Sequence, residues 1–275
     1  MQHPLIQKLI RWFVPLAALV AFAAWIFIAP PGLLGKADAV GYAVCHRLSA
    51  RSFHIGSRQL PLCARCSGTF TAAAVGLAFF AVTAGKRGGM PDKKFYIPLA
   101  IFFLAFAVDG SNSYLFLIKT TTGGLAQIPN LYIPNNTLRL FTGSGMGLTM
   151  ATFLFPAFNQ SVWKNADMTT PALGTWRQFL TLVGIMLLID LLILTDSPIV
   201  LYPLAIISPL GVLALLTIIY SIIWLIIMRQ DNTFTRFRDL WLPLLAGFTL
   251  AMLMILAIDL FRLQLTHTWG GFPLG

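Results

Sequence analysis

Acidic residues are scarce in this chain, and glutamate is missing altogether. Among 275 residues there are nine acidic side chains, all of them Asp, against nineteen Lys and Arg, which gives a formal net charge of +10. Only 10% of the residues are charged, whereas 57% are hydrophobic. This composition excludes an ordinary soluble domain and indicates a polytopic membrane protein.

Several sequence motifs are also missing. The chain has no phosphate-binding glycine loop, no zinc-protease helix and no nucleophile elbow. It shows no internal repeat and no low-complexity linker that would separate domains. We therefore predict one polytopic membrane domain that spans residues 1–275.

The basic excess has an ordinary explanation in a membrane protein. Lys and Arg in short loops orient the chain and contact anionic lipid headgroups. The expected partners are therefore the lipid bilayer and its anionic headgroups, and no nucleic acid.

Long apolar runs are what the sequence has in abundance. A helix needs roughly 20 apolar residues to cross a hydrocarbon core about 30 Å thick. By this measure we predict an all-α integral membrane protein with about seven transmembrane helices and a Cys- and His-containing loop between the first two. In the sixth run, Pro198, Pro203 and Pro209 predict a turn followed by a kinked or partly interfacial entry. The predicted spans are residues 11–30, 67–85, 96–118, 137–158, 178–195, 199–228 and 240–261.

The distribution of Lys and Arg gives a preferred orientation in the cell membrane. A cytoplasmic N-terminus places eleven basic residues on the inner side and eight on the outer side, in line with the positive-inside tendency. Five of the eight exceptions lie in or beside the cysteine segment. We predict a multi-pass protein with a cytoplasmic N-terminus and the cysteine loop on the outer side.

Ionisable residues inside the predicted spans gather toward that same outer side. Asp109 falls in the outer half of the third span, and Arg139 opens the fourth span from outside. Buried ionisable groups are costly and usually face a cavity or a partner. We expect Asp109 and Arg139 to form an ion pair, either at a functional site or simply to hold two helices together. Asp190 and Asp259 are expected to be structural or interfacial.

Small and polar residues interrupt the third and fourth spans. Residues 110–113, Gly-Ser-Asn-Ser, follow Asp109 and predict a broken helix that lines a cavity. Gly143, Gly145 and Gly147 predict a smooth helix face against which another helix packs closely.

All three cysteines lie within 22 residues of one another, which indicates a metal site. Cys63 and Cys66 have the spacing that grips one ion across a tight turn, and Cys45 plus an imidazole would complete the tetrahedron that zinc prefers. His46 and His54 are the two candidates for the fourth ligand. A zinc ion held in this way would carry a net charge of about −1, which nearby arginines would offset.

Other uses of the cysteines stay open. Haem attachment needs a His directly after the second Cys, where this chain has Ser67, and an iron–sulfur cluster normally needs four cysteines. A Cys63–Cys66 disulfide or redox-active dithiol is the main alternative to a metal site. Inert thiols are the third possibility.

Two separated blocks of sequence resemble a known family. The first block is Cys45-His46-Arg47, Arg51-Ser52-Phe53, Gln59-Leu60-Pro61 and Cys63-Ala64-Arg65-Cys66-Ser67-Gly68, and the second is Asp109-Gly110 with Asn135-Asn136-Thr137-Leu138-Arg139-Leu140-Phe141-Thr142-Gly143. Both are similar to the hallmarks of a prokaryotic family of predicted membrane proteins, domain-of-unknown-function family 2085. The resemblance covers about residues 40–147 and makes spans five to seven, about 176–262, an extension. It favours His46 over His54 as the fourth metal ligand, and it implies no activity.

Three functional hypotheses follow for this chain. In the first, a structural zinc site of Cys45, His46, Cys63 and Cys66 clamps the outer loop over a polar cavity that binds or passes a small ligand. The second is a metal-dependent, hydrolase-like membrane enzyme with Asp109 as base, which gains ground if His46 does not reach the metal. The third is an accessory or assembly subunit of a membrane complex. The expected ligand contacts are Asp109, Asn112, Asn136, Arg139, Arg51 and Gln59, although Asn136 has the alternative role of capping the fourth span.

Overall fold

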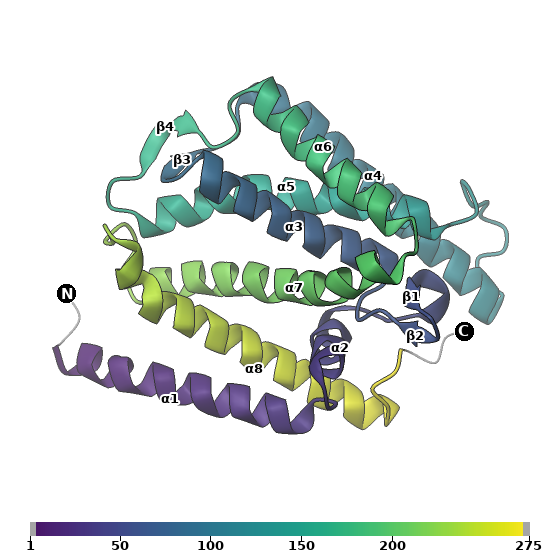
Figure 1. Ribbon diagram of the computed structural model, residues 1–275, viewed down its shortest axis with the longest axis horizontal. Coiled ribbons are helices and arrows are strands. Elements are labelled where there is room, and N and C mark those ends of the chain that lie inside the picture. The colour runs from purple at the N-terminus through teal and green to yellow at the C-terminus, as the bar shows by residue number, and fades with distance from the viewer. Residues whose placement is uncertain (1–3, 272–275) are drawn as a thin grey trace.

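The structure is a computed structural model, and it describes residues 4–271. Eight α-helices make up most of this part of the chain (Figure 1). Seven of them coincide with the seven predicted spans, so the all-α membrane architecture is confirmed. The eighth, α2, lies within the predicted cysteine loop. The helices are α1 (Pro4–Ile28), α2 (Leu33–Val44), α3 (Ala64–Thr83), α4 (Tyr96–Thr122), α5 (Asn136–Val162), α6 (Trp176–Ile193), α7 (Pro198–Ile227) and α8 (Trp241–Thr266).

The predicted fourth span differs from the others in composition. Six helices of the described chain are long and apolar enough to cross a membrane, and α5 is not among them. Figure 1 shows α5 among the other helices, and its polar residues Ser144, Thr152 and Asn159 are buried. A helix that other helices surround contacts protein rather than lipid, so it tolerates polar side chains that a lipid-facing helix does not.

Short strands and 3₁₀ turns join the helices. Strands β1 (His54–Ile55) and β2 (Arg58–Gln59) form an antiparallel hairpin within the cysteine loop. Strands β3 (Arg87–Gly89) and β4 (Asp167–Pro171) pair in parallel and tie together the connections that follow α3 and α5. The 3₁₀ turns are η1 (Ser49–Arg51), η2 (Lys93–Phe95) and η3 (Phe237–Leu240).

The connections between the helices gather at two ends of the bundle (Figure 1). We call one the cysteine end; it contains residues 29–63, 123–135, 194–197 and 267–271. The other is the opposite end, with residues 84–95, 163–175 and 228–240. In Figure 1 helix α1 begins at the opposite end and α8 finishes at the cysteine end, an arrangement that suits an odd number of passes.

Helices α3 and α5 pack through glycines at the centre of the bundle. A Cβ atom added to Gly143 would lie 2.2 Å from the Arg65 carbonyl oxygen, and one added to Gly147 would lie 2.1 Å from the Thr69 oxygen. Gly145 instead lies against the side chain of Phe102 in α4. The close approach predicted from the three glycines is therefore confirmed, and it brings Arg65 of α3 beside the first turns of α5.

The expected break after Asp109 is wrong. Helix α4 runs without interruption from Tyr96 to Thr122. Asn112 donates to the Tyr132 carbonyl, and Ser113 accepts from Arg65, so polar groups outside the helix bind these side chains while the backbone keeps its helical bonds. The turn expected in the sixth apolar run does occur, before α7, which begins with Pro198.

Candidate metal and polar site

The three cysteines meet at the cysteine end of the bundle. The Sγ atoms of Cys45, Cys63 and Cys66 all lie within 4.8 Å of one another. Cys45 follows the last residue of α2, Cys63 precedes α3, and Cys66 lies in the first turn of α3. Cys45 and Cys63 are 5% and 3% exposed, and all three are free thiols. Three such thiols from two segments of chain can hold one ion.

Hydrogen bonds favour a thiolate in this group. Cys45 Sγ accepts from the backbone N–H of Cys63 at 3.3 Å and from that of Arg47 at 3.5 Å. Contacts from the Cys63 and Cys66 thiols, together with these N–H groups, hold the pKa of Cys45 well below its ordinary range. A metal binds thiolates rather than thiols, so this environment suits a ligand.

Close backbone packing places Cys45 beside Cys63. A Cβ atom added to Gly41 of α2 would lie 2.0 Å from the carbonyl oxygen of Pro61. Only a residue without a Cβ allows α2 to approach the chain leading into α3 this closely. The sulfur of Cys45 thereby reaches the two cysteines at the start of α3.

Arg262 of α8 holds the same segment from the other side. Its guanidinium donates to the carbonyl oxygens of Tyr42, Cys45 and His46, the second of these at 2.6 Å, and it lies 3.9 Å from the centre of the Tyr42 ring. These carbonyls end helix α2 and need donors from outside it. Arg262 therefore fixes the backbone on which Cys45 is carried.

Neither histidine belongs to the cysteine group. Nδ1 of His46 accepts from the backbone N–H of Leu48 at 3.0 Å, and Nε2 of His54 lies 3.0 Å from the Ser49 hydroxyl. The group of possible metal ligands in the described chain contains only Cys45, Cys63 and Cys66. The expected fourth ligand, His46, is thus outside the group in this structure, because its ring turns back to its own loop.

The loop between Cys45 and Cys63 is fixed by internal contacts. Gln59 donates to the Arg47 carbonyl at 2.9 Å and to the Ser52 hydroxyl at 2.8 Å. Asp38 of α2 accepts from Arg47 at 2.9 Å and from Arg58 at 2.5 Å. Burial raises the pKa of Asp38 even though both arginines act against that rise. Gln59, an expected ligand contact, lies here as a brace of the loop.

Asp109 is the centre of a second polar group. Its carboxylate is 1% exposed and accepts from Arg65, from Tyr132 at 2.8 Å and from Thr142 at 3.3 Å. Burial and the bond to Asp109 raise the pKa of the Tyr132 phenol to about 12. Three helices and the 123–135 connection therefore meet at this carboxylate.

The ion pair expected between Asp109 and Arg139 does not form within the described chain. Arg65 takes that place, since the glycine-mediated packing of α3 on α5 puts Arg65 between the two helices. Arg139 instead donates to Asn136 at 2.9 Å, while remaining within electrostatic range of Asp109. Both residues thus belong to one polar group, as expected, but with a different partner for the acid.

Arg51 and Asn136 connect this polar group to the cysteine loop. Arg51 of η1 donates to the Ser113 carbonyl at 3.0 Å, and Asn136 donates to the Ser52 carbonyl at 3.4 Å. The residue that caps α5 is Asn135, whose side chain accepts from the N–H of Leu138, so the capping role considered for Asn136 is wrong.

Asn112 lies on the edge of the polar group and holds the 123–135 connection. Its amide donates to the Tyr132 carbonyl and accepts from the Leu131 backbone and the Asn130 side chain, each at 3.0 Å. The two remaining intramembrane acids lie apart: Asp190 accepts from Ser144 at 2.8 Å, and Asp259 lies fully buried in α8. The structural or interfacial roles expected for these two acids stay a prediction.

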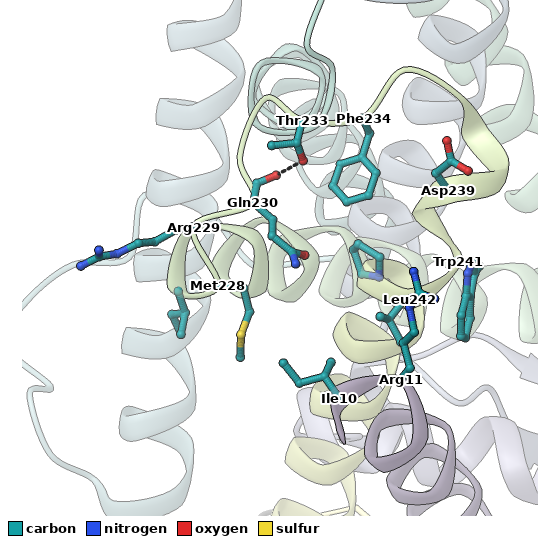
Figure 2. A pocket seen from close by; sticks show the side chains of 12 residues that line it. Ile10, Arg11, Met228, Arg229, Gln230, Thr233, Phe234, Asp239, Trp241 and Leu242 are labelled. Atoms are coloured by element: carbon teal, nitrogen blue, oxygen red, sulfur yellow. Dashed lines mark hydrogen bonds between the residues drawn. The ribbon is translucent and has the colours of Figure 1, made fainter. Parts of the chain in front are cut away.

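Two cavities lie away from the cysteines. One of about 770 Å³ is at the opposite end, between α1 and the α7–α8 connection; Figure 2 shows the Arg11 side chain beside Trp241 and Leu242, and Arg229 directed away. Another of about 340 Å³ is mostly apolar and includes Asn112, Ser111 and Leu131. Of the expected site residues, only Asn112 lines either of these cavities.

Three residues of the site escaped prediction as contacts. Arg65 lies between Cys63 and Cys66, so its position in the motif was a usable signal. Tyr132 and Arg262 gave no such signal, because Tyr132 lies in a connection outside both sequence blocks and Arg262 lies 217 residues from its partner Cys45.

Comparison with known proteins gives a family for the site region. Residues 45–153 match the model of a family described as "Predicted membrane protein (DUF2085)". An uncharacterized protein, MJ1492, of Methanocaldococcus jannaschii is 26% identical over 165 residues, an alignment that covers 56% of this chain and 96% of that protein. No solved structure matches the chain.

The matched segment contains all three cysteines, Asp109 and Arg139, and it ends within α5. The resemblance predicted from the two sequence blocks is thus confirmed: residues 45–153 of this multi-pass membrane protein are similar to the DUF2085 family of predicted membrane proteins.

Proposed function

We propose that this protein is a membrane zinc protein in which Cys45, Cys63 and Cys66 hold one Zn²⁺ ion at the cysteine end. The observation that carries the proposal is the grouping of three buried sulfur atoms within 4.8 Å. Sulfurs bound to one tetrahedral zinc at about 2.3 Å are about 3.8 Å apart, so small side-chain rotations suffice.

The charge around the cysteines supports this assignment. Three thiolates and one Zn²⁺ carry a net charge of −1. Arg47 and Arg262 lie within electrostatic range of Cys45, and Arg51 lies within range of Cys63. Guanidinium groups of this kind stabilise an anionic metal centre in a membrane.

Three protein ligands leave one coordination position for a ligand from outside the chain. The ion would fasten the loop of residues 46–62 to the start of α3, as in the clamp that the sequence predicted. Arg51 and Arg139, which belong to the polar group around Asp109, lie within electrostatic range of Cys63, so we expect the small ligand between the metal and this group. The function we propose is therefore the binding of a small ligand at a zinc-clamped site.

A metal-dependent enzyme is the second candidate, and the same ligand count favours it. Catalytic zinc sites typically have three protein ligands and an open fourth position. Asp109 is poorly suited as the base, because Arg65, Tyr132 and Thr142 already occupy its carboxylate.

Metal analysis of the purified protein tests the proposal. We expect about one zinc per chain by inductively coupled plasma mass spectrometry, and almost none in Cys63→Ser. His46→Ala and His54→Ala should keep their zinc, since both rings are bound to other atoms. In protein loaded with Co²⁺, added imidazole should change the visible spectrum by entering the open position.

Two results would contradict this zinc assignment. One is wild-type protein that contains a Cys63–Cys66 disulfide and no metal. The other is loss of zinc from His46→Ala as complete as that from Cys63→Ser, which would restore the closed four-ligand site.

We also propose that the cysteine end faces outward and the opposite end faces the cytoplasm. Arg47, Arg51, Arg139 and Arg262, which count against this orientation, are all buried in contacts of their own. Exposed basic residues such as Lys93, Lys94, Lys164 and Arg177 lie toward the opposite end. There they can contact the anionic headgroups of the inner leaflet.

Labelling of single introduced cysteines measures this orientation. Ala126 and Asn165 are both exposed, one at each end of the bundle. A membrane-impermeant maleimide added to intact cells should label Ala126→Cys, and should label Asn165→Cys only after permeabilisation. Unsubstituted protein gives the background from the native thiols. The reverse pattern would invert the proposed topology.

A further inference from the structure

Three guanidinium groups surround a single carboxylate at the cysteine end. Arg51 and Arg65 both donate to Ser113, one to its carbonyl at 3.0 Å and the other to its hydroxyl at 3.1 Å. Arg139 lies within electrostatic range of both arginines. Asp109 is the acid paired with Arg65, so the group has a formal charge of +2.

This excess positive charge is buried. Arg51 is 8% exposed and Arg139 is 5% exposed, while the side chain of Arg65 is 15% exposed. Burial and the neighbouring Arg65 lower the pKa of Arg51 from its ordinary value. Charges removed from water are costly unless a counter-charge meets them, and within the described residues this group has only Asp109.

Much of the hydrogen-bonding capacity of two arginines is unused. A guanidinium has five N–H donors. Among the described residues, the Arg51 side chain makes one hydrogen bond, to Ser113, and the Arg139 side chain makes one, to Asn136. Nε of Arg139 is buried without an acceptor. Buried donors of this kind indicate a missing acceptor.

The proposed metal centre accounts for only part of this charge. A zinc ion with three thiolates has a net charge of −1, and Arg47 and Arg262 also lie near Cys45. The arginines near the cysteines and Asp109 therefore still outnumber the negative charges after the metal is counted.

We infer that Arg51 and Arg139 bind an anionic oxygen group, a carboxylate or a phosphate, carried by the ligand of this site. Planar guanidinium groups match the paired oxygens of both anions and form strong charge-assisted hydrogen bonds with them. The inference rests on the proposed function in that it names the chemistry of the ligand bound near the zinc.

The anionic group can come from two sources, a soluble molecule or a lipid headgroup. The mostly apolar cavity of about 340 Å³ beside Asn112 lies next to this group along α4. An apolar chain attached to a phosphate would have a place there. The experiment therefore includes both sources.

Thermal unfolding of the zinc-containing protein in a nonionic detergent, followed by tryptophan fluorescence, measures the binding. Orthophosphate and acetate are titrated against chloride at equal ionic strength, and dioleoyl phosphatidate is compared with phosphatidylcholine in mixed micelles. A ligand that binds only the folded protein raises the unfolding temperature. Stabilisation by phosphate or acetate indicates a soluble anion, and stabilisation by phosphatidate alone indicates a headgroup.

Substitutions place the bound anion. Arg51→Gln and Arg139→Gln should each weaken its apparent binding by about 10–100-fold, as loss of a charged hydrogen bond predicts. Arg58→Gln is the matched control, because Arg58 belongs to the same loop but has a 45% exposed side chain paired with Asp38. If Arg139→Gln does not fold, Arg139→Lys keeps the charge and loses the paired donors, and it should bind more weakly than wild type.

Three results would overturn the inference. The first is no stabilisation by any of these anions, and the second is binding by the Arg51 and Arg139 variants that is as tight as binding by wild type. The third is an Arg58→Gln variant that binds as weakly as the Arg51 and Arg139 variants. Zinc content is measured in every sample. If protein without zinc binds the anion, this inference holds and the zinc site is contradicted. If protein with zinc does not bind the anion, the zinc site holds and this inference is contradicted.

Discussion

Asp109→Asn should lower the free energy of unfolding by about 3–5 kcal/mol, the cost of leaving a buried charge without its partner. Asp109 is the carboxylate bound to Arg65, and it also accepts from Tyr132 and Thr142. If Asp109 lost its charge, the guanidinium groups of Arg51, Arg65 and Arg139 would repel one another with no counter-charge among them. Unfolding in increasing mole fractions of sodium dodecyl sulfate gives the comparison with wild type.

Asp239→Asn provides the matched control for that experiment. Asp239 lies 3.8 Å from Arg238, and their side chains are 48% and 74% exposed. An exposed pair of this kind contributes about 0–1 kcal/mol. In the double variant Arg65→Gln with Asp109→Asn, the loss should be smaller than the sum of the two single losses. Equal effects of Asp109→Asn and Asp239→Asn would show that the Asp109 group is not stabilised by charge.

Gly147→Ala should destabilise the bundle by about 1–3 kcal/mol, the usual cost of overpacking. The new methyl group would lie 2.1 Å from the Thr69 carbonyl oxygen, so α3 and α5 would have to separate. This cost opposes the gain of about 1 kcal/mol that Ala has over Gly in a helix. The same detergent titration measures it.

Gly184→Ala in α6 separates packing from helix propensity. A Cβ atom at Gly184 would meet nothing within 4 Å. We therefore expect that variant to be as stable as wild type or slightly more stable. If Gly147→Ala behaved in the same way, close backbone packing would not be what joins α3 to α5.

The architecture could be predicted from the sequence because apolar length is a local property. The seven predicted spans correspond to seven helices, and the glycines at 143, 145 and 147 identified the close contact made by α5. Helix α2 was missed, since its 12 residues lie in a segment too short and too mixed to resemble a span. The two small strand pairs were missed for the same reason.

The site could be predicted only as a set of residues, without their partners. The cysteines form a group as expected, yet His46 turns away from it to its own backbone. Asp109 is bound by Arg65 rather than Arg139. Which arginine pairs with a buried acid depends on how the helices pack, and the spacing of residues along the chain does not show this packing. For the same reason, no local signal marked Tyr132 or Arg262.

The contact between Arg262 and the end of α2 makes the cysteine group depend on the order of synthesis. Cys45 is made early in the chain, but the guanidinium that binds its carbonyl belongs to α8, which follows the other seven helices. The backbone around Cys45 therefore reaches its final form only after α8 has entered the membrane. Binding of an ion at the three thiols would then be a late step in the maturation of this protein, because it would require that α8 has already entered the membrane.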